Sequence, residues 1–187
     1  MQKIIKNINS AATIRRLYIC MQASNVSGGW LASKERTEPW RGIVLHASDG
    51  FAASGSIEHL RKVGFSYHYI IERDGRIIKL VPLSKIAFHA GVSRSYLGKD
   101  CNHYTIGICF ANYESGKEPI KPAQLKSAAW LVSELKKAYP GIAMLTTHYA
   151  VSPGRKTDPA MLAREWMDDV AEANDVVVWL PPKKGKA

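Results

Sequence analysis

The sequence lacks long apolar runs and a recognisable secretory leader. None of its hydrophobic stretches approaches the roughly 18 residues that a membrane-spanning helix requires. Lys6, Arg15 and Arg16 interrupt the N-terminal stretch, which therefore has no continuous apolar region of the kind found in signal peptides. We accordingly expect a protein that is cytoplasmic as synthesised and has no transmembrane segment.

The chain is also poor in cysteine. Its three cysteines, Cys20, Cys101 and Cys109, cannot all pair within one chain, and none belongs to a C-x-x-C motif. This pattern indicates neither a disulfide framework nor a cysteine-based zinc knuckle. We expect the three side chains to be small buried hydrophobic groups.

Positive charge is abundant, but it does not identify a partner. The formal net charge is +10 and the pI about 9.6, which would suit nucleic acid, a membrane surface or a cell-wall polymer. The cations are dispersed, apart from the tail "PPKKGKA", and no nucleic-acid-reading motif is recognisable. Nucleic-acid binding is therefore an alternative based on charge alone, and we expect no specific nucleic-acid partner.

Short β-rich segments alternate with helical patterns, as expected for an α/β protein. Asp74-Gly75 marks the turn of a hairpin over 66–82. Pro122 suits the first turn of a helix over 121–141. Further strands are predicted at 43–46, 105–112 and 142–150, and further helices at 56–64 and 159–173. These elements predict one central β-sheet of mixed direction, flanked by helices.

The length of 187 residues favours a single domain, because it is too short for two comfortable ones. We predict a globular domain over 39–175, preceded by a polar lead at 1–38 and followed by a basic tail at 176–187. The lead is either partly packed or flexible, and the tryptophans of "WLASKERTEPW" favour packing of a part of it. We expect a monomer.

Two of the six histidines directly follow short apolar strands. His46 ends "IVLH" and His148 ends "AMLTTH", and Asp158 comes ten residues after the second. If the two strands are neighbours, these side chains form a His-His-Asp set, which suits a catalytic zinc with an open position for water. The spacing alone also leaves a structural role open. We interpret His59 and His103 as surface residues, and for His68, which alternates with Tyr67 and Tyr69, a structural role is open beside a functional one.

Five motifs together resemble a known family of enzymes. In order and separation they are similar to the zinc-dependent N-acetylmuramoyl-L-alanine amidases, a superfamily that includes phage amidase-type lysozymes, cytosolic anhydro-muropeptide amidases and animal peptidoglycan recognition proteins. The resemblance extends from about Arg41 to Trp166 and implies the central-sheet fold of that family. The motifs are "IVLHAS", "SYHYIIERDG", "FHAGVS", "CNHYTIGICFAN" and "THYAVSPGRKTDP".

The resemblance implies a zinc site and two catalytic side chains. His46, His148 and Asp158 match the zinc ligands, and the aspartate is typical of the muropeptide-amidase branch. Lys156 matches the lysine that faces the reacting carbonyl, where it would stabilise the oxyanion. Tyr67 matches a tyrosine implicated in catalysis in phage lysozymes, although an alternating strand position is also compatible with a core residue.

The resemblance further implies a substrate groove and reveals one departure. Its substrate-binding residues would be His89, Asn102 and Arg155. Muropeptide amidases carry a glutamate in the strand "IGIE", proposed as the proton carrier, and this chain has Cys109 there. Because a neutral thiol is a poor substitute for a carboxylate, we expect Tyr67 to be the catalytic partner instead.

The expected reaction is zinc-dependent hydrolysis of the amide between N-acetylmuramic acid and L-alanine. The partner would be peptidoglycan or a muropeptide. We favour a phage or prophage endolysin, which fits the missing signal peptide and would act on the cell wall after release. The alternative is a cytosolic enzyme that recycles anhydro-muropeptides. A module that binds peptidoglycan without cutting it ranks below both, because all three ligand positions are filled.

Overall fold

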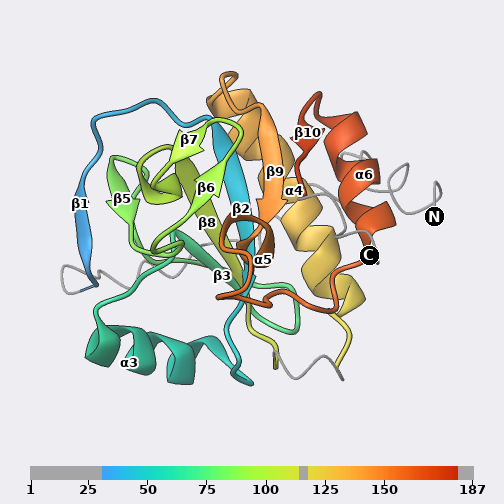
Figure 1. Cartoon of the computed structure of the whole chain (residues 1–187). Coiled ribbons are helices and arrows are strands. Elements are labelled where there is room, and N and C mark those ends of the chain that lie inside the picture. The colour runs from blue at the N-terminus through green and yellow to red at the C-terminus, as the bar shows by residue number, and fades with distance from the viewer. Residues whose placement is uncertain (1–30, 114–117, 181–187) are drawn as a thin grey trace.

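A six-stranded sheet forms the centre of the molecule (Figure 1). The computed structural model describes residues 31–113 and 118–180. Neighbouring strands of the sheet are parallel, except for the antiparallel pair β3 and β4, so the predicted mixed sheet is confirmed. In spatial order, the strands are β10 (Val177–Val178), β9 (Met144–Thr147), β2 (Gly42–Ala47), β8 (Thr105–Phe110), β3 (Tyr69–Ile71) and β4 (Ile77–Lys79).

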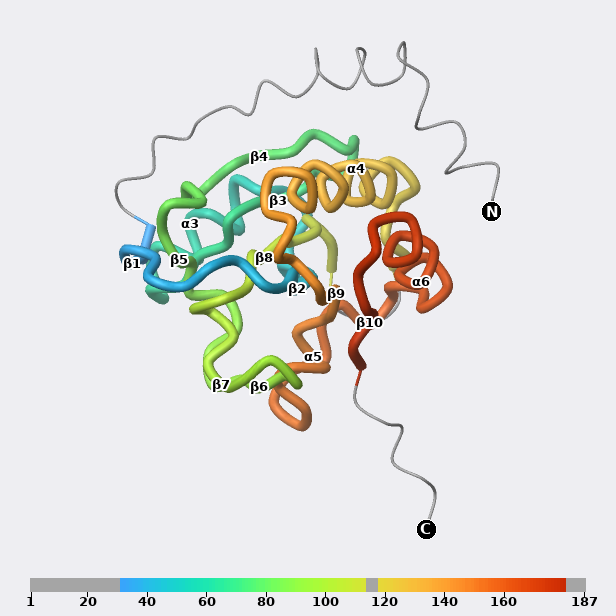
Figure 2. The backbone as a smooth tube through the Cα atoms, turned by 90° about the horizontal axis from the view of Figure 1, so that it is seen from above, coloured from blue at the N-terminus to red at the C-terminus, as the bar shows by residue number. Residues whose placement is uncertain are grey.

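The two sides of the sheet are covered differently (Figure 2). Helix α4 lies along one side, and α5 lies on the other side together with the small β6–β7 hairpin. Two-residue and three-residue strands build two further small sheets, β1–β5 and β6–β7. The helices are α3 (Ala53–Val63), η1 (Cys101–His103), α4 (Pro122–Ala138), α5 (His148–Val151) and α6 (Arg164–Ala173). The small strands are β1 (Ser33–Glu35), β5 (Lys85–Ala87), β6 (Arg94–Ser95) and β7 (Gly98–Lys99).

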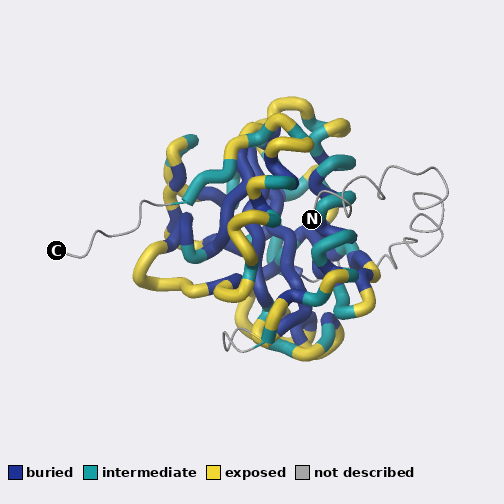
Figure 3. The backbone as a smooth tube through the Cα atoms, turned by 90° about the vertical axis from the view of Figure 1, so that its right-hand side faces the viewer, coloured by how far each residue is buried: buried dark blue, intermediate teal, exposed yellow. Residues whose placement is uncertain are grey.

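Side chains of the central strands alternate between a largely apolar side and a side that carries the histidine of the site. Ile43 and Leu45 of β2 belong to the main hydrophobic core, which includes residues of α4 and α6. Val44 and His46 point to the opposite side, as the two-residue period of a strand requires. Strand β8 alternates in the same way and presents Cys109 opposite His46. The central strands are buried, whereas exposed residues concentrate in the surrounding loops (Figure 3).

Helix α4 is fixed to the sheet by a buried amide as well as by its apolar stripe. Gln124 Nε2 donates to the carbonyls of Ile71 and Ala111, at 3.0 and 3.2 Å. Its Oε1 accepts from the backbone N–H of Lys121 at 3.1 Å, which caps the helix. The apolar stripe that packs on the sheet comprises Ala128, Leu131, Val132 and Leu135.

The folded body extends beyond the predicted domain at both ends. Strand β1 belongs to the predicted lead and pairs with β5 in an antiparallel register. Strand β10 belongs to the predicted tail and pairs with β9. The rest of the lead and the tail, 1–30 and 181–187, lies outside the described residues.

Three local details differ from the sequence prediction. The strand predicted over 142–150 ends at Thr147, and helix α5 begins at His148. The connection between β3 and β4 has three residues rather than two between Glu72 and Arg76. The backbone N–H of Glu72 donates to the Arg76 carbonyl at 2.9 Å, and Gly75 between them adopts a φ of 89°. The last helix was expected from Pro159 but begins at Arg164, because the preceding residues form a turn and an extended N-cap at Ala163.

Over 31–113 and 118–180, no helix combines the length and the apolar character that crossing a bilayer demands. Cys101 and Cys109 are buried, as predicted, and are not joined in a disulfide, whereas Cys20 lies outside the described residues.

We predict that Gln124→Leu lowers the free energy of unfolding by about 1–3 kcal/mol, because the buried Ala111 carbonyl loses its donor. Urea denaturation of the variant and of the wild type would measure the difference. Lys137→Ala, at an exposed position of the same helix, is the control and should change stability by less than about 0.5 kcal/mol. A Gln124→Leu protein as stable as the control would contradict the anchoring role.

Candidate metal centre

The structure brings His46, His148 and Asp158 together, with one ligand atom of each within 4.8 Å of the others. His46 lies near the end of β2, and His148 is the first residue after the neighbouring parallel strand β9. His46 Nδ1 is 3.4 Å from Asp158 Oδ2, and His148 Nδ1 is 3.0 Å from Asp158 Oδ1. All three side chains are buried, so the cluster faces inward from the end of the sheet.

The loop between α5 and α6 carries Asp158 back to the histidines. The backbone N–H of Tyr149 donates to the Asp158 carbonyl at 2.9 Å, which closes the loop onto α5. Within the loop, Gly154 adopts a φ of 80°, a conformation that favours glycine. The sharp turn predicted around Pro153-Gly154 therefore has a backbone basis.

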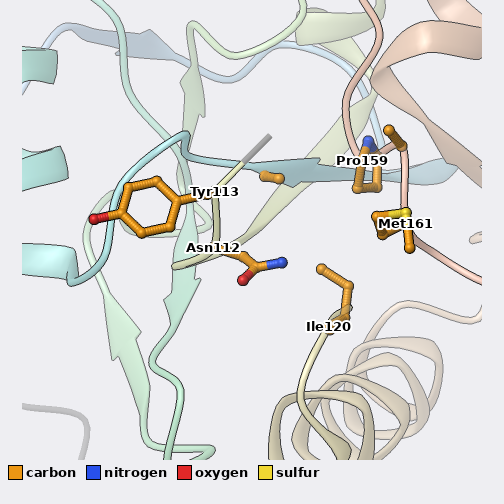
Figure 4. Close-up of a pocket in the computed structure, with 7 residues that line it drawn as sticks. Asn112, Tyr113, Ile120, Pro159 and Met161 are labelled. Carbon is orange, nitrogen blue, oxygen red and sulfur yellow. The ribbon is translucent and has the colours of Figure 1, made fainter. Parts of the chain in front are cut away.

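After Asp158 the chain packs against the end of β8. Pro159 and Met161 face Asn112 and Ile120 across a narrow gap (Figure 4). This gap has no room for a ligand, and we interpret it as packing that holds the loop in place.

The second ring nitrogen of each metal-site histidine also has a partner. His46 Nε2 lies 3.0 Å from His89 Nδ1, and His148 Nε2 lies 3.3 Å from the Ala90 carbonyl oxygen. Both imidazoles thus direct Nδ1 towards Asp158 and Nε2 towards the segment 89–90.

The donor set fits a zinc ion. His46 Nδ1 is buried and makes no hydrogen bond, and its distance from Asp158 is too long for a well-formed one. A cation between Nδ1 of His46, Nδ1 of His148 and the carboxylate of Asp158 would satisfy this atom. Two imidazoles and one carboxylate form a ligand set used by catalytic zinc sites.

Burial sets the protonation states that metal binding requires. Burial, with the nearby charge of His148, lowers the pKa of His46 to about 4. Burial alone would raise the pKa of Asp158, but its hydrogen bond with His148 and the proximity of His46 outweigh this and hold the pKa well below its usual range. At neutral pH, His46 is therefore neutral and Asp158 ionised, which are the forms that bind a metal.

A cavity of about 390 Å³ opens onto the cluster. Lys156 and Arg155 line it from the Asp158 loop, and Tyr67 lines it from the segment before β3. The cavity also reaches His59 and Phe65, which the sequence analysis did not assign to a site. Both residues are exposed and belong to α3 and the residues after it, where neither spacing nor charge distinguishes them from ordinary surface residues.

Tyr67 lies beside His46, and Cys109 lies next to Tyr67. The rings of Tyr67 and His46 are 5.0 Å apart between centroids. Burial raises the pKa of Tyr67 well above 10, and a hydrogen bond with the Cys109 thiol and nearby charge raise it further. Tyr67 therefore remains a protonated phenol, which can donate a proton or a hydrogen bond.

Two of the three predicted substrate-binding residues do not line this cavity. His89 is buried behind His46, with Nε2 3.2 Å from the Thr105 carbonyl. Asn102 Oδ1 accepts from the backbone N–H groups of His89 and Ala90, at 3.0 and 2.7 Å. Arg155 does line the cavity, but its Nη2 also donates to the Ala90 carbonyl at 2.6 Å.

Comparison with known sequences gives one family and a consistent set of relatives. A family model described as N-acetylmuramoyl-L-alanine amidase matches residues 36–161. The chain is 42% identical over 105 residues to the 1,6-anhydro-N-acetylmuramyl-L-alanine amidase AmpD of Citrobacter freundii, covering 55% of this chain and 53% of that protein. It is 41% identical over 126 residues to AmpD of Salmonella typhimurium strain LT2, covering 65% and 64%. The chain thus matches about half to two thirds of these relatives' lengths.

Solved structures share the fold. A crystal structure of AmpD superposes with a TM-score of 0.60 at 26% identity, covering 76% of this chain and 96% of that one. AmiD of Escherichia coli, in complex with an anhydro-N-acetylmuramic acid peptide, gives a TM-score of 0.61 at 23% identity, covering 74% and 58%. The endolysin of Thermus scotoductus bacteriophage Ph2119 gives 0.55 at 23% identity, covering 78% and 91%. The last two likenesses concern the fold alone.

We predict that the metal-free protein loses stability as the pH falls below about 6.5, partly through His68. Burial lowers the pKa of His68 to about 3 in the folded state, whereas the unfolded chain titrates near 6.5. Between these values the unfolded state binds the extra proton, so the free energy of unfolding falls with pH by up to about 1.4 kcal/mol per unit for this residue.

Chemical denaturation at several pH values, with a chelator present, would measure this slope. His68→Asn should be less stable at neutral pH but show a shallower decline between about pH 6 and 4. His59→Asn, at an exposed position, controls for the substitution itself. An unchanged slope in His68→Asn would contradict the assignment.

Proposed function

Because the chain belongs to the N-acetylmuramoyl-L-alanine amidase family, we propose that it hydrolyses the amide between N-acetylmuramic acid and L-alanine in anhydro-muropeptides. The observation that carries this proposal is the buried cluster of His46, His148 and Asp158 at the cavity that Lys156 and Tyr67 also line. The cavity offers a site where a carbonyl group can meet a metal, a cation and a phenol together.

His46, His148 and Asp158 would hold the zinc. When bound, zinc polarises a carbonyl group and lowers the pKa of water to about 7. Lys156 is exposed at the cavity wall and close enough to lower the pKa of His46 by its charge. It would stabilise the oxyanion that develops on the substrate carbonyl, because it carries its charge without any proton exchange.

Tyr67 would serve as the proton donor or as the group that orients the attacking water. Its hydroxyl stays protonated because burial raises its pKa well above 10. Cys109 occupies the strand position at which the family resemblance would lead us to expect a glutamate. In this chain, the hydrogen bond between Tyr67 and the Cys109 thiol would orient the phenol.

The relatives favour a recycling enzyme over an endolysin. The curated matches are named as 1,6-anhydro-N-acetylmuramyl-L-alanine amidases, which supports the interpretation that the sequence analysis kept as the alternative. The endolysin interpretation came from the missing signal peptide, and the phage endolysin in the comparisons adds a shared fold at low identity. We therefore propose the anhydro-muropeptide as the substrate in preference to the intact wall.

Mass spectrometry of two substrates would test the proposal. The protein should release a peptide with a free L-alanine N-terminus from a 1,6-anhydro-muropeptide, and much more slowly from intact sacculi. Chelation should abolish the release, and added zinc should restore it. Faster cleavage of sacculi would favour the endolysin, and a zinc-loaded, folded protein that cleaves neither substrate would favour a binding module.

Lys156→Ala and Asp158→Ala should separate catalysis from metal retention. We expect Lys156→Ala to keep stoichiometric zinc and to lose about 100- to 1000-fold in kcat, because an oxyanion donor is removed. Asp158→Ala should lose both zinc and activity. Zinc content by elemental mass spectrometry and steady-state kinetics would distinguish the two, with Lys62→Ala as the surface-lysine control. A Lys156→Ala protein with wild-type kcat would contradict the role of Lys156.

A further inference from the structure

His46 and His148 of the candidate metal centre contact two consecutive residues, His89 and Ala90. His46 Nε2 contacts His89 Nδ1, and His148 Nε2 contacts the carbonyl of Ala90, at 3.0 and 3.3 Å. We propose that His89 and Ala90 orient the two histidines of the candidate metal centre, and that His89 is a positioning residue for His46. This inference rests on the zinc site of the proposed function.

The hydrogen bonds of His89 determine which nitrogen of His46 is free to bind a metal. The Thr105 carbonyl can only accept, so the His89 nitrogen that faces it at 3.2 Å, Nε2, carries the hydrogen. Because neutral imidazole has one donor and one acceptor, His89 Nδ1 accepts from His46 Nε2–H. His46 therefore presents the lone pair of Nδ1, the atom that faces Asp158 and makes no hydrogen bond.

The ring of His89 packs so closely against Gly107 that no larger residue fits at position 107 without displacing it. A Cβ at Gly107 of β8 would lie 2.6 Å from His89 Cγ and 2.8 Å from Cδ2, closer than real side chains approach. His89 is thus held between Gly107 on one strand and His46 on its neighbour, and it has little freedom to turn. This confinement transmits a fixed orientation to His46.

Two further residues hold the backbone of the segment 89–92. Asn102 Oδ1 accepts from the N–H groups of both His89 and Ala90, at 3.0 and 2.7 Å. Arg155 Nη2 donates to the carbonyls of Ala90 and Val92, at 2.6 and 3.0 Å. Asn102 and Arg155 thereby fix the carbonyl that receives His148 Nε2–H, and we assign Asn102 to positioning rather than to substrate binding.

Zinc affinity of a matched set of variants tests the role of His89. His89→Leu removes the acceptor and should weaken zinc binding by about 10- to 100-fold. His89→Asn places an amide oxygen near the position of Nδ1 and should recover most of the affinity. Gly107→Ala leaves His89 in the chain but displaces its ring, so it should weaken zinc binding in the same direction.

The measurements are a competition titration with a chromophoric chelator and the visible spectrum of the cobalt-substituted protein. His68→Asn is the control, because His68 is an equally buried imidazole whose ring lies 5.9 Å from that of His89 and bonds to backbone groups. It should lose stability but keep the zinc affinity and the cobalt spectrum. A merely structural role of His89 would give the same result for His89→Leu, and that result would overturn the proposal.

Rescue provides a second criterion. If His89→Asn binds zinc no more tightly than His89→Leu, the acceptor at Nδ1 is not what matters, and the proposal fails. If the wild-type protein itself binds no zinc, the ligand assignment of the proposed function fails and this inference fails with it. A wild-type protein that binds zinc but does not hydrolyse the anhydro-muropeptide would instead count against the proposed reaction alone.

Asn102 allows positioning to be separated from substrate binding. Asn102→Asp keeps the accepting oxygen, whereas Asn102→Leu removes it. In the positioning role, Asn102→Leu weakens zinc binding several-fold more than Asn102→Asp does, and the zinc-saturated variants keep the wild-type KM. An unchanged zinc affinity with a raised KM in Asn102→Leu would overturn the assignment of Asn102.

Discussion

The parallel register of β2 with β9 is the constraint on which the metal centre depends. Leu45 lies opposite Thr147, so the next residue of each strand path, His46 and His148, emerges at the same end of the sheet. A slip of β2 by one residue would turn His46 towards α4 and place Leu45 in the site. The apolar side of β2, which packs into the main core, therefore enforces the register that the opposite side needs for chemistry.

Burial makes the same cluster both suitable for a metal and costly without one. The interior favours the neutral form of His46, which is the form that coordinates a metal. It also encloses the carboxylate of Asp158, and enclosing an ionised group is unfavourable unless it is paired. A bound cation would offset this cost through three ligand contacts at once. We therefore regard metal binding and local stability as coupled properties of the loop that carries Asp158.

The sequence could identify the candidate metal ligands but not the groups that contact their second ring nitrogens. His46, His148 and Asp158 were identified because strand ends and family motifs mark them directly. His89 and Asn102 were interpreted as substrate-binding residues, since a motif gives the position of a residue without the direction of its side chain. The positioning roles that we propose for them rest on hydrogen bonds to backbone groups of distant segments, and such contacts leave no periodic pattern in the sequence. The strands β5, β6 and β7 escaped prediction for a similar reason, because two or three residues are too short to show alternation.

The alternation of β8 explains why position 109 bears on the chemistry whatever residue occupies it. Cys109 is the register partner of His46, and it points to the same side of the sheet. A carboxylate there would stand next to the metal centre and could carry a proton. A thiol in that place leaves the proton to a neighbour, and Tyr67 is the group that contacts both His46 and Cys109. Because the pKa of Tyr67 is raised rather than lowered, the phenol suits donation to the departing amine better than abstraction from water. With Cys109 at this position, the mechanism we propose assigns the charge to Lys156 and the proton to Tyr67.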